Sequence, residues 1–384
     1  MKILLYSWGE FNNRVLEKNL AEIGNTVISY SRKCNDYTKD MELAWEMIDL
    51  VNNENIEAVI SFNYFPIISM ICKTTGIPYY SWIFDCPHHT LNSRTVTNTC
   101  NHIGCFDKKQ VKYYEAMGIK TIRHIPLGVD TRLFYLNDRS YRCDVSFLGR
   151  LYTDQYAYYD NIDMPSGIRN SIDLLVKNQK FCYTEDYVDS FLNTINPGII
   201  SEILGNAGFL LNPDEFFDDD MLTFRTSVIE RKISIEERRD LTDMLAGMDC
   251  DFRLYTGSDV SYNPQLAKCS KGHADYYRQM PSIFKHSKIN INNTLRSIGS
   301  GIPVRALDIL ACGGFLLSNY QPEIAEYFEE NKEVVFYYSL DDLKEKIEFY
   351  LEHDKDRNNI ALAGCVAVKE RFDFRKQLKE LLGD

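Results

Sequence analysis

The chain has 384 residues, of which 45% are hydrophobic and 26% are charged, and its formal net charge is −12. This composition is typical of a globular protein with a large core, and a chain of this length usually divides into two or three domains. The excess of acidic residues argues against a nucleic-acid backbone or an anionic membrane as the main partner, so we expect no nucleic-acid binding.

The first part of the chain alternates short apolar runs with amphipathic segments. The apolar runs predict strands at residues 2–7, 26–30, 58–62, 79–84, 103–106 and 122–125. The amphipathic segments predict helices at residues 13–23, 41–53, 67–73 and 108–117. This alternation predicts a parallel sheet with helices on both faces.

Polar and glycine residues follow three of these predicted strands. Because ligands bind beyond the carboxyl ends of the strands in such sheets, we expect these residues to converge on one edge. They are Ser7, Trp8, Gly9, Asn63 and the run from Asp85 to His89.

The alternation breaks at residues 126–130, and polar residues follow at 137–142. We therefore place a boundary between a first domain, residues 1–138, and a second domain, residues 139–370. A sheet restarts at residues 143–150, after which apolar residues recur at helical spacing from about residue 152 to about residue 248, which predicts a helical insertion. The run Asp218 to Asp220 inside it is interpreted as a solvated loop rather than a metal-binding triplet.

The strand and helix pattern resumes after the insertion. Strands are predicted at 252–255, 288–291, 315–318 and 334–337, and helices at 276–284, from about 303, at 340–353 and at 360–370. A final helical segment is predicted at residues 371–384, where it could return to the first domain. Two parallel-sheet domains in tandem form a cleft, which is a usual place for a ligand shared by both.

The loop from Gly299 to Pro303 has the features of an anion site. Glycine lets the backbone approach a ligand, Pro303 suits the start of a helix, and the free N–H groups of a helix start attract an anion. Arg296 and Arg305 flank the loop with permanent positive charge. The alternative is an ordinary strand-to-helix turn with a solvated arginine at each end.

The sequence predicts neither a transmembrane segment nor a signal peptide. No run of about eighteen apolar residues occurs, and residues 1–9 are too short and too quickly polar for a signal peptide. Eleven cysteines, an odd number without paired spacing, favour reduced thiols. We expect a cytoplasmic protein without a transmembrane segment; its oligomeric state stays open.

Several motifs together resemble the GT-B glycosyltransferases. In the second half these are Gly149-Arg150, residues 271–276 (KGHADY) and residues 291–320. In the first half they are residues 81–87 (SWIFDCP), Phe106-Asp107 and residues 126–130 (PLGVD). The chain looks most like the CgeB-type (spore maturation protein) branch. The resemblance implies two Rossmann-like domains facing a cleft, with the acceptor on the first and a nucleotide-sugar on the second.

The resemblance also implies donor-site residues. In the broader group two acidic residues separated by seven others grip the donor sugar and the nucleotide ribose. Asp308 stands at the second position, whereas Ser300 stands at the first, which puts recognition of the sugar in doubt and leaves Ser300 as a loop residue near the diphosphate. The expected diphosphate ligands are Arg150, Lys271, Arg296, Arg305 and the amides of Gly299, Ser300 and Gly301, and with these cations a metal is not required. His273 and Tyr276 are expected to border the base.

Asp85 and His88 are the candidates for a base that activates the acceptor hydroxyl. The alternatives are that Asp85 caps a helix and that each histidine is structural. Cys86, His88, His89, Cys100, His102 and Cys105 also lie close in sequence, but their spacings match no standard zinc finger or ribbon.

The predicted function is therefore that of a hexosyltransferase-type enzyme without a cofactor. It would move a sugar from a nucleoside-diphosphate sugar, with a UDP-sugar as the expected donor, to an acceptor hydroxyl on a glycan, a protein or a small molecule. One alternative is a degenerate GT-B protein that serves as a structural or binding component of surface-glycan assembly, which Ser300 keeps open. A nucleotide-sugar epimerase on the same fold lacks motif support. The donor sugar, the acceptor and the stereochemical outcome are not predicted.

Overall fold

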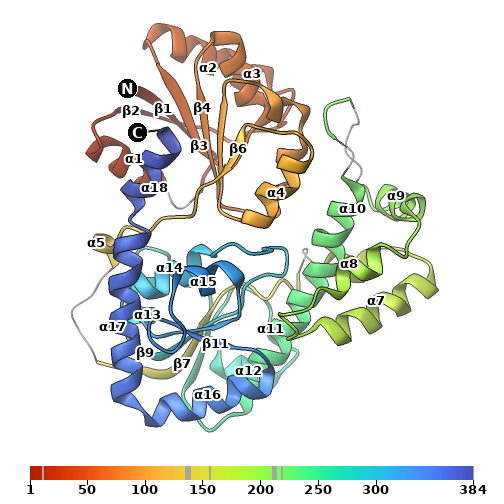
Figure 1. Ribbon diagram of the computed structural model, residues 1–384, viewed down its shortest axis with the longest axis vertical. Helices are drawn as coiled ribbons and strands as arrows, with labels where there is room; N and C mark the ends of the chain where they lie inside the picture. The colour runs from red at the N-terminus through yellow and green to blue at the C-terminus, as the bar shows by residue number, and fades with distance from the viewer. Residues whose placement is uncertain (11–12, 135–139, 155–156, 210–213, 218, 384) are drawn as a thin grey trace.

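The computed structural model describes residues 1–10, 13–134, 140–154, 157–209, 214–217 and 219–383. It contains two parallel sheets, one in each half of the chain, and a helical arm at one side (Figure 1). The α/β class with two parallel-sheet domains is confirmed. The proposed boundary between residues 138 and 139, and Asp218 of the acidic run, lie outside the described residues.

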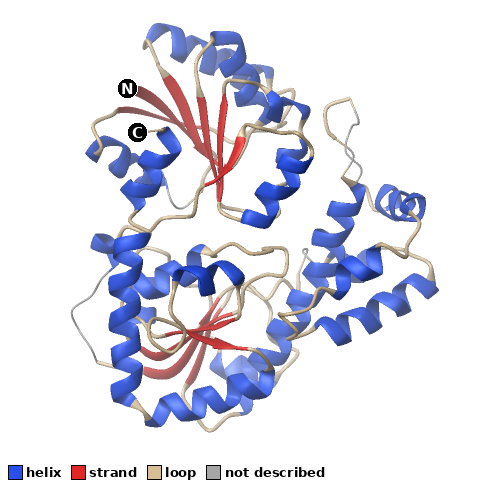
Figure 2. Ribbon diagram, viewed as in Figure 1, coloured by secondary structure: helices blue, strands red, loops and turns tan. Residues whose placement is uncertain are grey.

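The first sheet has the strand order β2-β1-β3-β4-β5-β6, and every pair is parallel. Its strands are β1 (Lys2–Ser7), β2 (Thr26–Ser31), β3 (Ala58–Phe62), β4 (Tyr79–Ile83), β5 (Asn101–Cys105) and β6 (Ile122–His124). The helices are α1 (Asn13–Glu22), α2 (Met41–Asn53), α3 (Pro66–Thr75) and α4 (Lys108–Ala116). All residues of β3 and β4 are buried, because helices cover both faces of the sheet (Figure 2).

The second sheet has the order β11-β10-β9-β7-β8 and is also parallel. Its strands are β7 (Cys143–Leu148), β8 (Phe252–Tyr255), β9 (Ser287–Asn292), β10 (Leu316–Asn319) and β11 (Val335–Tyr337). The helices of this half are α5 (Thr131–Phe134), α12 (Pro264–Cys269), α13 (Met280–Lys285), α14 (Val304–Ala311), α15 (Pro322–Tyr327), α16 (Leu340–Glu352) and α17 (Asp354–Arg371). The strand order reverses between β7 and β9, where ligands bind in open sheets of this kind.

The helical insertion lies between β7 and β8. Its helices are α6 (Tyr158–Asn161), α7 (Ser166–Gln179), α8 (Tyr187–Leu192), α9 (Pro197–Asn206), α10 (Asp220–Thr223), a π-helical turn (Phe224–Ile229) and α11 (Glu230–Gly247). They form an arm beside the two sheets (Figure 1) with its own apolar core, which includes Ile172, Ile203 and Phe224. The later part of α11 instead packs into the core of the second sheet through Leu241 and Leu245. The arm is thus anchored by α11.

The last helix, α18 (Phe374–Leu382), packs on the first domain. The rings of Phe374 and Trp82 lie 5.0 Å apart, and Arg123 donates to the carbonyl of Leu381. A Cβ atom at Gly104 in β5 would lie 2.9 Å from Leu381 Cδ1, so glycine is needed for this approach. No described helix combines the length and the apolar character that a bilayer crossing requires.

Candidate functional site

The loop from Gly299 to Gly301 contacts the first domain. A Cβ atom at Gly301 would lie 2.7 Å from Phe106 Cδ2, and one at Gly299 would lie 2.9 Å from Lys109 Cδ. These glycines therefore allow the close approach of Phe106 and Lys109 of the first domain, and their contact with a diphosphate stays a prediction.

Ser300 is turned toward the same contact. Its Oγ lies 3.0 Å from Asp107 Oδ1 and 2.7 Å from Glu323 Oε1, and its N–H donates to Asp107 Oδ2. Ser300 is also buried. Its polar atoms thus bridge Asp107 of the first domain and Glu323 of the second, and its place beside a diphosphate stays a prediction.

Gly301→Ala tests this contact, and we expect the substitution to weaken the packing between the two domains. The new Cβ would meet the Phe106 carbonyl oxygen at 2.8 Å as well as its ring, and a backbone atom cannot rotate away. Overpacking of this kind costs about 1–3 kcal/mol, so the melting temperature falls and the radius of gyration from solution scattering rises. Gly167→Ala in α7, where a Cβ has no neighbour within 4 Å, is the matched control. An unchanged radius in Gly301→Ala would contradict the assignment.

The guanidinium of Arg296 forms its hydrogen bonds with residues of the insertion. Its guanidinium pairs with Glu237, which is 0% exposed, donates to the Cys182 carbonyl at 2.7 Å and lies 4.2 Å from the centre of the Tyr183 ring. Nη2 also donates to the Gln179 carbonyl. The donors of Arg296 therefore hold the loop after β9 against the insertion, and its role as a diphosphate ligand stays a prediction.

Asp308 and Arg305 lie one turn apart on α14, beside the carboxyl end of β7. Asp308 is 0% exposed; Tyr276 Oη donates to its Oδ1 at 2.9 Å, whereas its Oδ2 has no partner. Burial raises the pKa of Asp308 to about 7, against the opposing charge of Arg305. Arg305 donates to the Leu148 carbonyl, and its Nε is buried without a partner. Topology thus brings together three predicted residues, two of which keep an unsatisfied polar atom.

The remaining predicted donor residues lie at the outer side of this group. Arg150, Lys271 and His273 are exposed. The Arg150 carbonyl accepts from Arg238, and the Lys271 N–H donates to the carbonyl of Leu254 in β8. These residues stand on the β7 and β8 side of the point where the strand order reverses.

Two arginines of α11 were missed in the sequence. Arg238 is buried and donates to the carbonyls of Arg150 and Asn293, which follow β7 and β9. Arg231, two turns earlier on the same face, lies 4.5 Å from the centre of the Tyr152 ring, and its Nε and Nη1 are buried without a partner. Four basic residues occur within residues 231–239, so no spacing in the sequence singles out Arg231.

Arg231 also lies near the first domain. Burial lowers the pKa of His89 to about 4, and the charges of His88 and Arg231 add to the effect. His89 Nε2 lies 3.2 Å from Ser227 Oγ of the π-helical turn. Arg231 therefore lies between the loop after β4 and the loop after β7.

The predicted edge of the first domain forms around Asn63. Its Oδ1 accepts from the N–H groups of Phe84 and Asp85, and its Nδ2 donates to Asp85 Oδ2 at 2.7 Å. Asp85 is exposed, and Trp8 is 38% exposed after β1. Asn63 and Asp85 are thus brought together as their places after neighbouring strands predict.

His88 forms hydrogen bonds within its own domain. The backbone N–H of Tyr64 donates to His88 Nε2 at 3.0 Å, and Thr90 Oγ1 lies 2.7 Å from the same nitrogen. Burial lowers the pKa of His88, against the raising effect of Asp85. His88 Nε2 thus holds the loop after β4 against Tyr64, and the role of His88 as a catalytic base stays a prediction.

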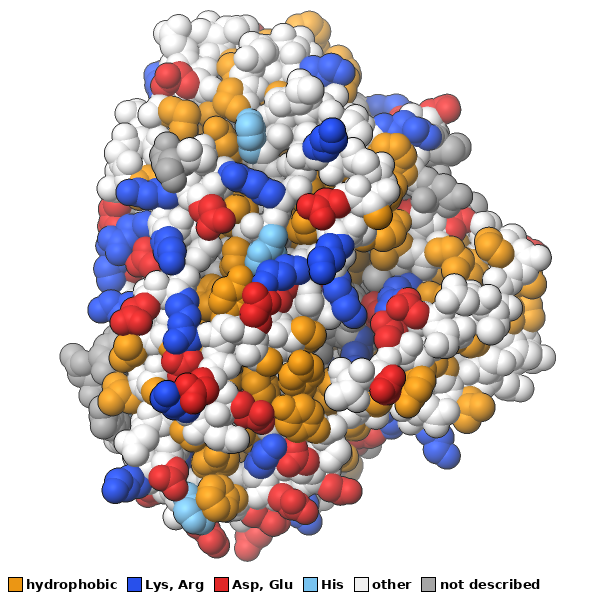
Figure 3. All heavy atoms as spheres, in the orientation of Figure 1, with side chains coloured by type: hydrophobic (Ala, Val, Ile, Leu, Met, Phe, Trp, Pro, Cys, Tyr) orange, Lys and Arg blue, Asp and Glu red, His pale blue; other side chains and the backbone are white. Residues whose placement is uncertain are grey.

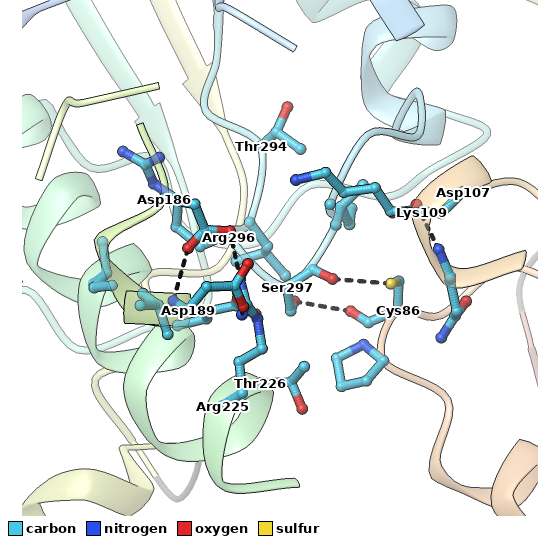
Figure 4. Close-up of a pocket in the computed structure, with 18 of the residues that line it drawn as sticks. Cys86, Asp107, Lys109, Asp186, Asp189, Arg225, Thr226, Thr294, Arg296 and Ser297 are labelled. Carbon is cyan, nitrogen blue, oxygen red and sulfur yellow. Dashed lines mark hydrogen bonds and ion pairs between the residues drawn. The ribbon is translucent and has the colours of Figure 1, made fainter. Parts of the chain in front are cut away.

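A cavity of about 590 Å³ lies between the insertion and both sheet domains (Figures 3 and 4). Only Arg296 and Gly299 among the predicted donor residues line it. The first domain contributes Cys86 and Lys109 to its wall, and the insertion contributes Arg225. Within the described ranges, no three His, Cys, Asp or Glu side chains are grouped to hold a metal ion.

Comparison with known proteins agrees with this architecture. Residues 231–383 match the family described as "Glycosyl transferase-like". The chain has the GT-B fold. Spore protein CgeB of Bacillus subtilis is 20% identical over 305 residues, which cover 79% of this chain and 73% of the relative. The resemblance to CgeB-type proteins that the motifs predict is thus confirmed.

Two solved structures show the same fold over the whole chain. The glycosyltransferase from Rickettsia africae superimposes with a TM-score of 0.55 at 13% identity, covering 100% of this chain and 99% of that one. Anabaena Alr3699/HepE in complex with UDP-glucose has a TM-score of 0.56 at 9% identity, covering 100% and 98%.

Proposed function

We propose that this protein transfers a sugar from a nucleoside-diphosphate sugar, with a UDP-sugar as the expected donor, to an acceptor hydroxyl. The observation that carries the proposal is Arg231, a guanidinium with unpaired donors at the point where the strand order reverses. Arg305 and Asp308 on α14 lie beside β7 at the same end of the sheet. A solved structure with the same fold has UDP-glucose bound.

The chemistry fits these groups. The acceptor oxygen bonds to the anomeric carbon as the bond from that carbon to the diphosphate breaks, and negative charge builds on the leaving group. A guanidinium fixed there stabilises that charge without a metal ion. The proton of the acceptor hydroxyl passes to a carboxylate, for which exposed Asp85 is our candidate.

A panel of nucleoside diphosphates and their sugars tests the proposal. We expect UDP to raise the melting temperature, since a ligand that binds only the folded state stabilises it. We also expect slow release of UDP from one UDP-sugar, unchanged by a metal chelator. The absence of a thermal shift with every nucleotide would overturn the proposal.

The second candidate is a degenerate GT-B protein that binds or organises other components of surface-glycan assembly. Ser300 favours it, because the position that carries an acid in the broader group is here buried in the contact between domains. This candidate predicts that no donor is turned over. Release of UDP from a UDP-sugar by the wild type, lost in Arg231→Ala, would exclude it.

A further inference from the structure

The cavity beside the insertion is separate from the group around Arg231. Glu230, at the start of α11, lines the cavity, whereas the next residue, Arg231, packs on Tyr152. On the other side, Cys86 and Ser297 join the two domains through two hydrogen bonds of 3.0 and 3.1 Å between side chains and carbonyls. The cavity therefore adjoins the place proposed for the diphosphate.

One wall of the cavity is a set of carboxylates around Arg225. Its Nε donates to Glu230 Oε1 at 2.7 Å, its Nη2 donates to Asp186 Oδ2 at 2.7 Å, and its Nη1 pairs with Asp189. Figure 4 shows Arg225, Asp186 and Asp189 gathered at this wall. Three carboxylates around one guanidinium leave the wall with a net negative charge and hold each carboxylate in a fixed orientation.

The rest of the wall suits a ring with many hydroxyl groups. Tyr113, Tyr183 and Tyr320 contribute aromatic surface. The second guanidinium of the wall, Arg296, is paired with Glu237 and two carbonyls. The donors of both arginines are used within the protein, and the three carboxylates around Arg225 outnumber the one lysine of the lining, Lys109, so we expect an acceptor that carries a phosphate or carboxylate to be disfavoured. The volume lies within the roughly 300–1,000 Å³ of small-molecule sites.

We propose that this cavity binds the acceptor, and that the acceptor is a neutral saccharide unit whose hydroxyl groups donate to Asp186, Asp189 and Glu230. The proposal rests on the glycosyltransferase function proposed above and names the class of its second substrate. Burial raises the pKa of Glu230 to about 7, with Arg225 opposing; the Arg225 charge holds the pKa of Asp186 below its ordinary value despite burial.

The test measures the rate of UDP release from the UDP-sugar that the protein hydrolyses, with and without an added acceptor. The probes are glucose, N-acetylglucosamine and maltose, each compared with glucose 6-phosphate and glucuronic acid. We expect at least one neutral saccharide to accelerate release and the charged compounds to be weaker. Asp186→Asn and Asp189→Asn are expected to raise the KM for the saccharide about tenfold each, since they remove a charged hydrogen-bond acceptor.

Asp160→Asn is the matched control. Asp160 belongs to the same insertion and is a half-exposed acid paired with Lys232 at 3.0 Å, but it does not line the cavity. We expect its KM for the saccharide to equal that of the wild type. If UDP binds and the donor is hydrolysed, but every neutral saccharide is inert or the charged ones are preferred, this inference fails alone. If no nucleotide binds, the proposed function itself fails.

Discussion

Arg231→Ala is expected to lower kcat for sugar transfer by about 10²–10³-fold, the usual effect of removing one fixed donor from a developing anion. Arg231 has two buried donors without a protein partner, and its guanidinium is held 4.5 Å from the centre of the Tyr152 ring. Removing it takes a positive charge from where the diphosphate leaves. Hydrolysis of the donor without acceptor is expected to fall in parallel, because both reactions break the same bond. The measurement is kcat for UDP release with and without acceptor.

The control for this effect is Arg239→Ala on the same helix. Arg239 is exposed and lies 4.7 Å from the centre of the Tyr262 ring, so it also stacks on a tyrosine but lies away from the cleft. We expect its kcat to equal that of the wild type. Arg231→Lys keeps the charge without the planar fork and is expected to fall between the two. Wild-type turnover in Arg231→Ala would remove this residue from the mechanism.

The sheets were predictable because their signals are local. Apolar runs at β3 and β4 are buried on both faces, and the helices between them carry their own end signals, such as the Asp40 cap of α2 and Gly76 after α3. Parallel topology then places Asn63 beside Asp85 without further information. The helical spacing of the insertion was equally predictable, although the packing of α11 into the core of the second sheet was not.

The contacts of the candidate site residues could not be predicted where the partners are distant in sequence. The partner of Ser300, Asp107, lies 193 residues earlier, and no local pattern reveals that pairing. The same holds for Arg296, whose charge is taken by Glu237. Arg231 could not be singled out from the sequence, because several basic residues lie close to it in the same helix. A sequence shows which residues carry charge, whereas the fold decides which charges remain unpaired.

One helix of the insertion links the two proposed substrate sites. Glu230 lines the cavity and Arg231 lies on the nucleotide side. Glu237 forms an ion pair with Arg296, and Arg238 donates hydrogen bonds to carbonyls that follow β7 and β9. A shift of α11 would therefore change both proposed sites together, and on this proposal the insertion belongs to the active site.

Asp308→Asn is expected to stabilise the unliganded protein above neutral pH. Burial raises the pKa of Asp308 from 3.8 to about 7. Because the folded state holds the proton more tightly than the unfolded state, the stability that Asp308 contributes is complete below about pH 4 and is lost as the pH rises toward 7. Asparagine keeps the hydrogen bond with Tyr276 and removes the buried charge. The difference in melting temperature between the variant and the wild type should grow from about pH 4 to about pH 7 and level off above it.

We expect nucleotide binding, in contrast to folding, to favour the ionised form of Asp308. A ribose hydroxyl that donates to Asp308 Oδ2, which has no partner in the protein, favours the ionised carboxylate. The affinity of the wild type for UDP should therefore increase from about pH 6 to about pH 8, whereas Asp308→Asn should bind UDP more weakly and without that increase. Isothermal titration at several pH values measures both. Glu230 titrates in the same range, but it is present in both proteins, so only the difference between them reports on Asp308. An identical pH dependence in the two proteins would place the ribose elsewhere.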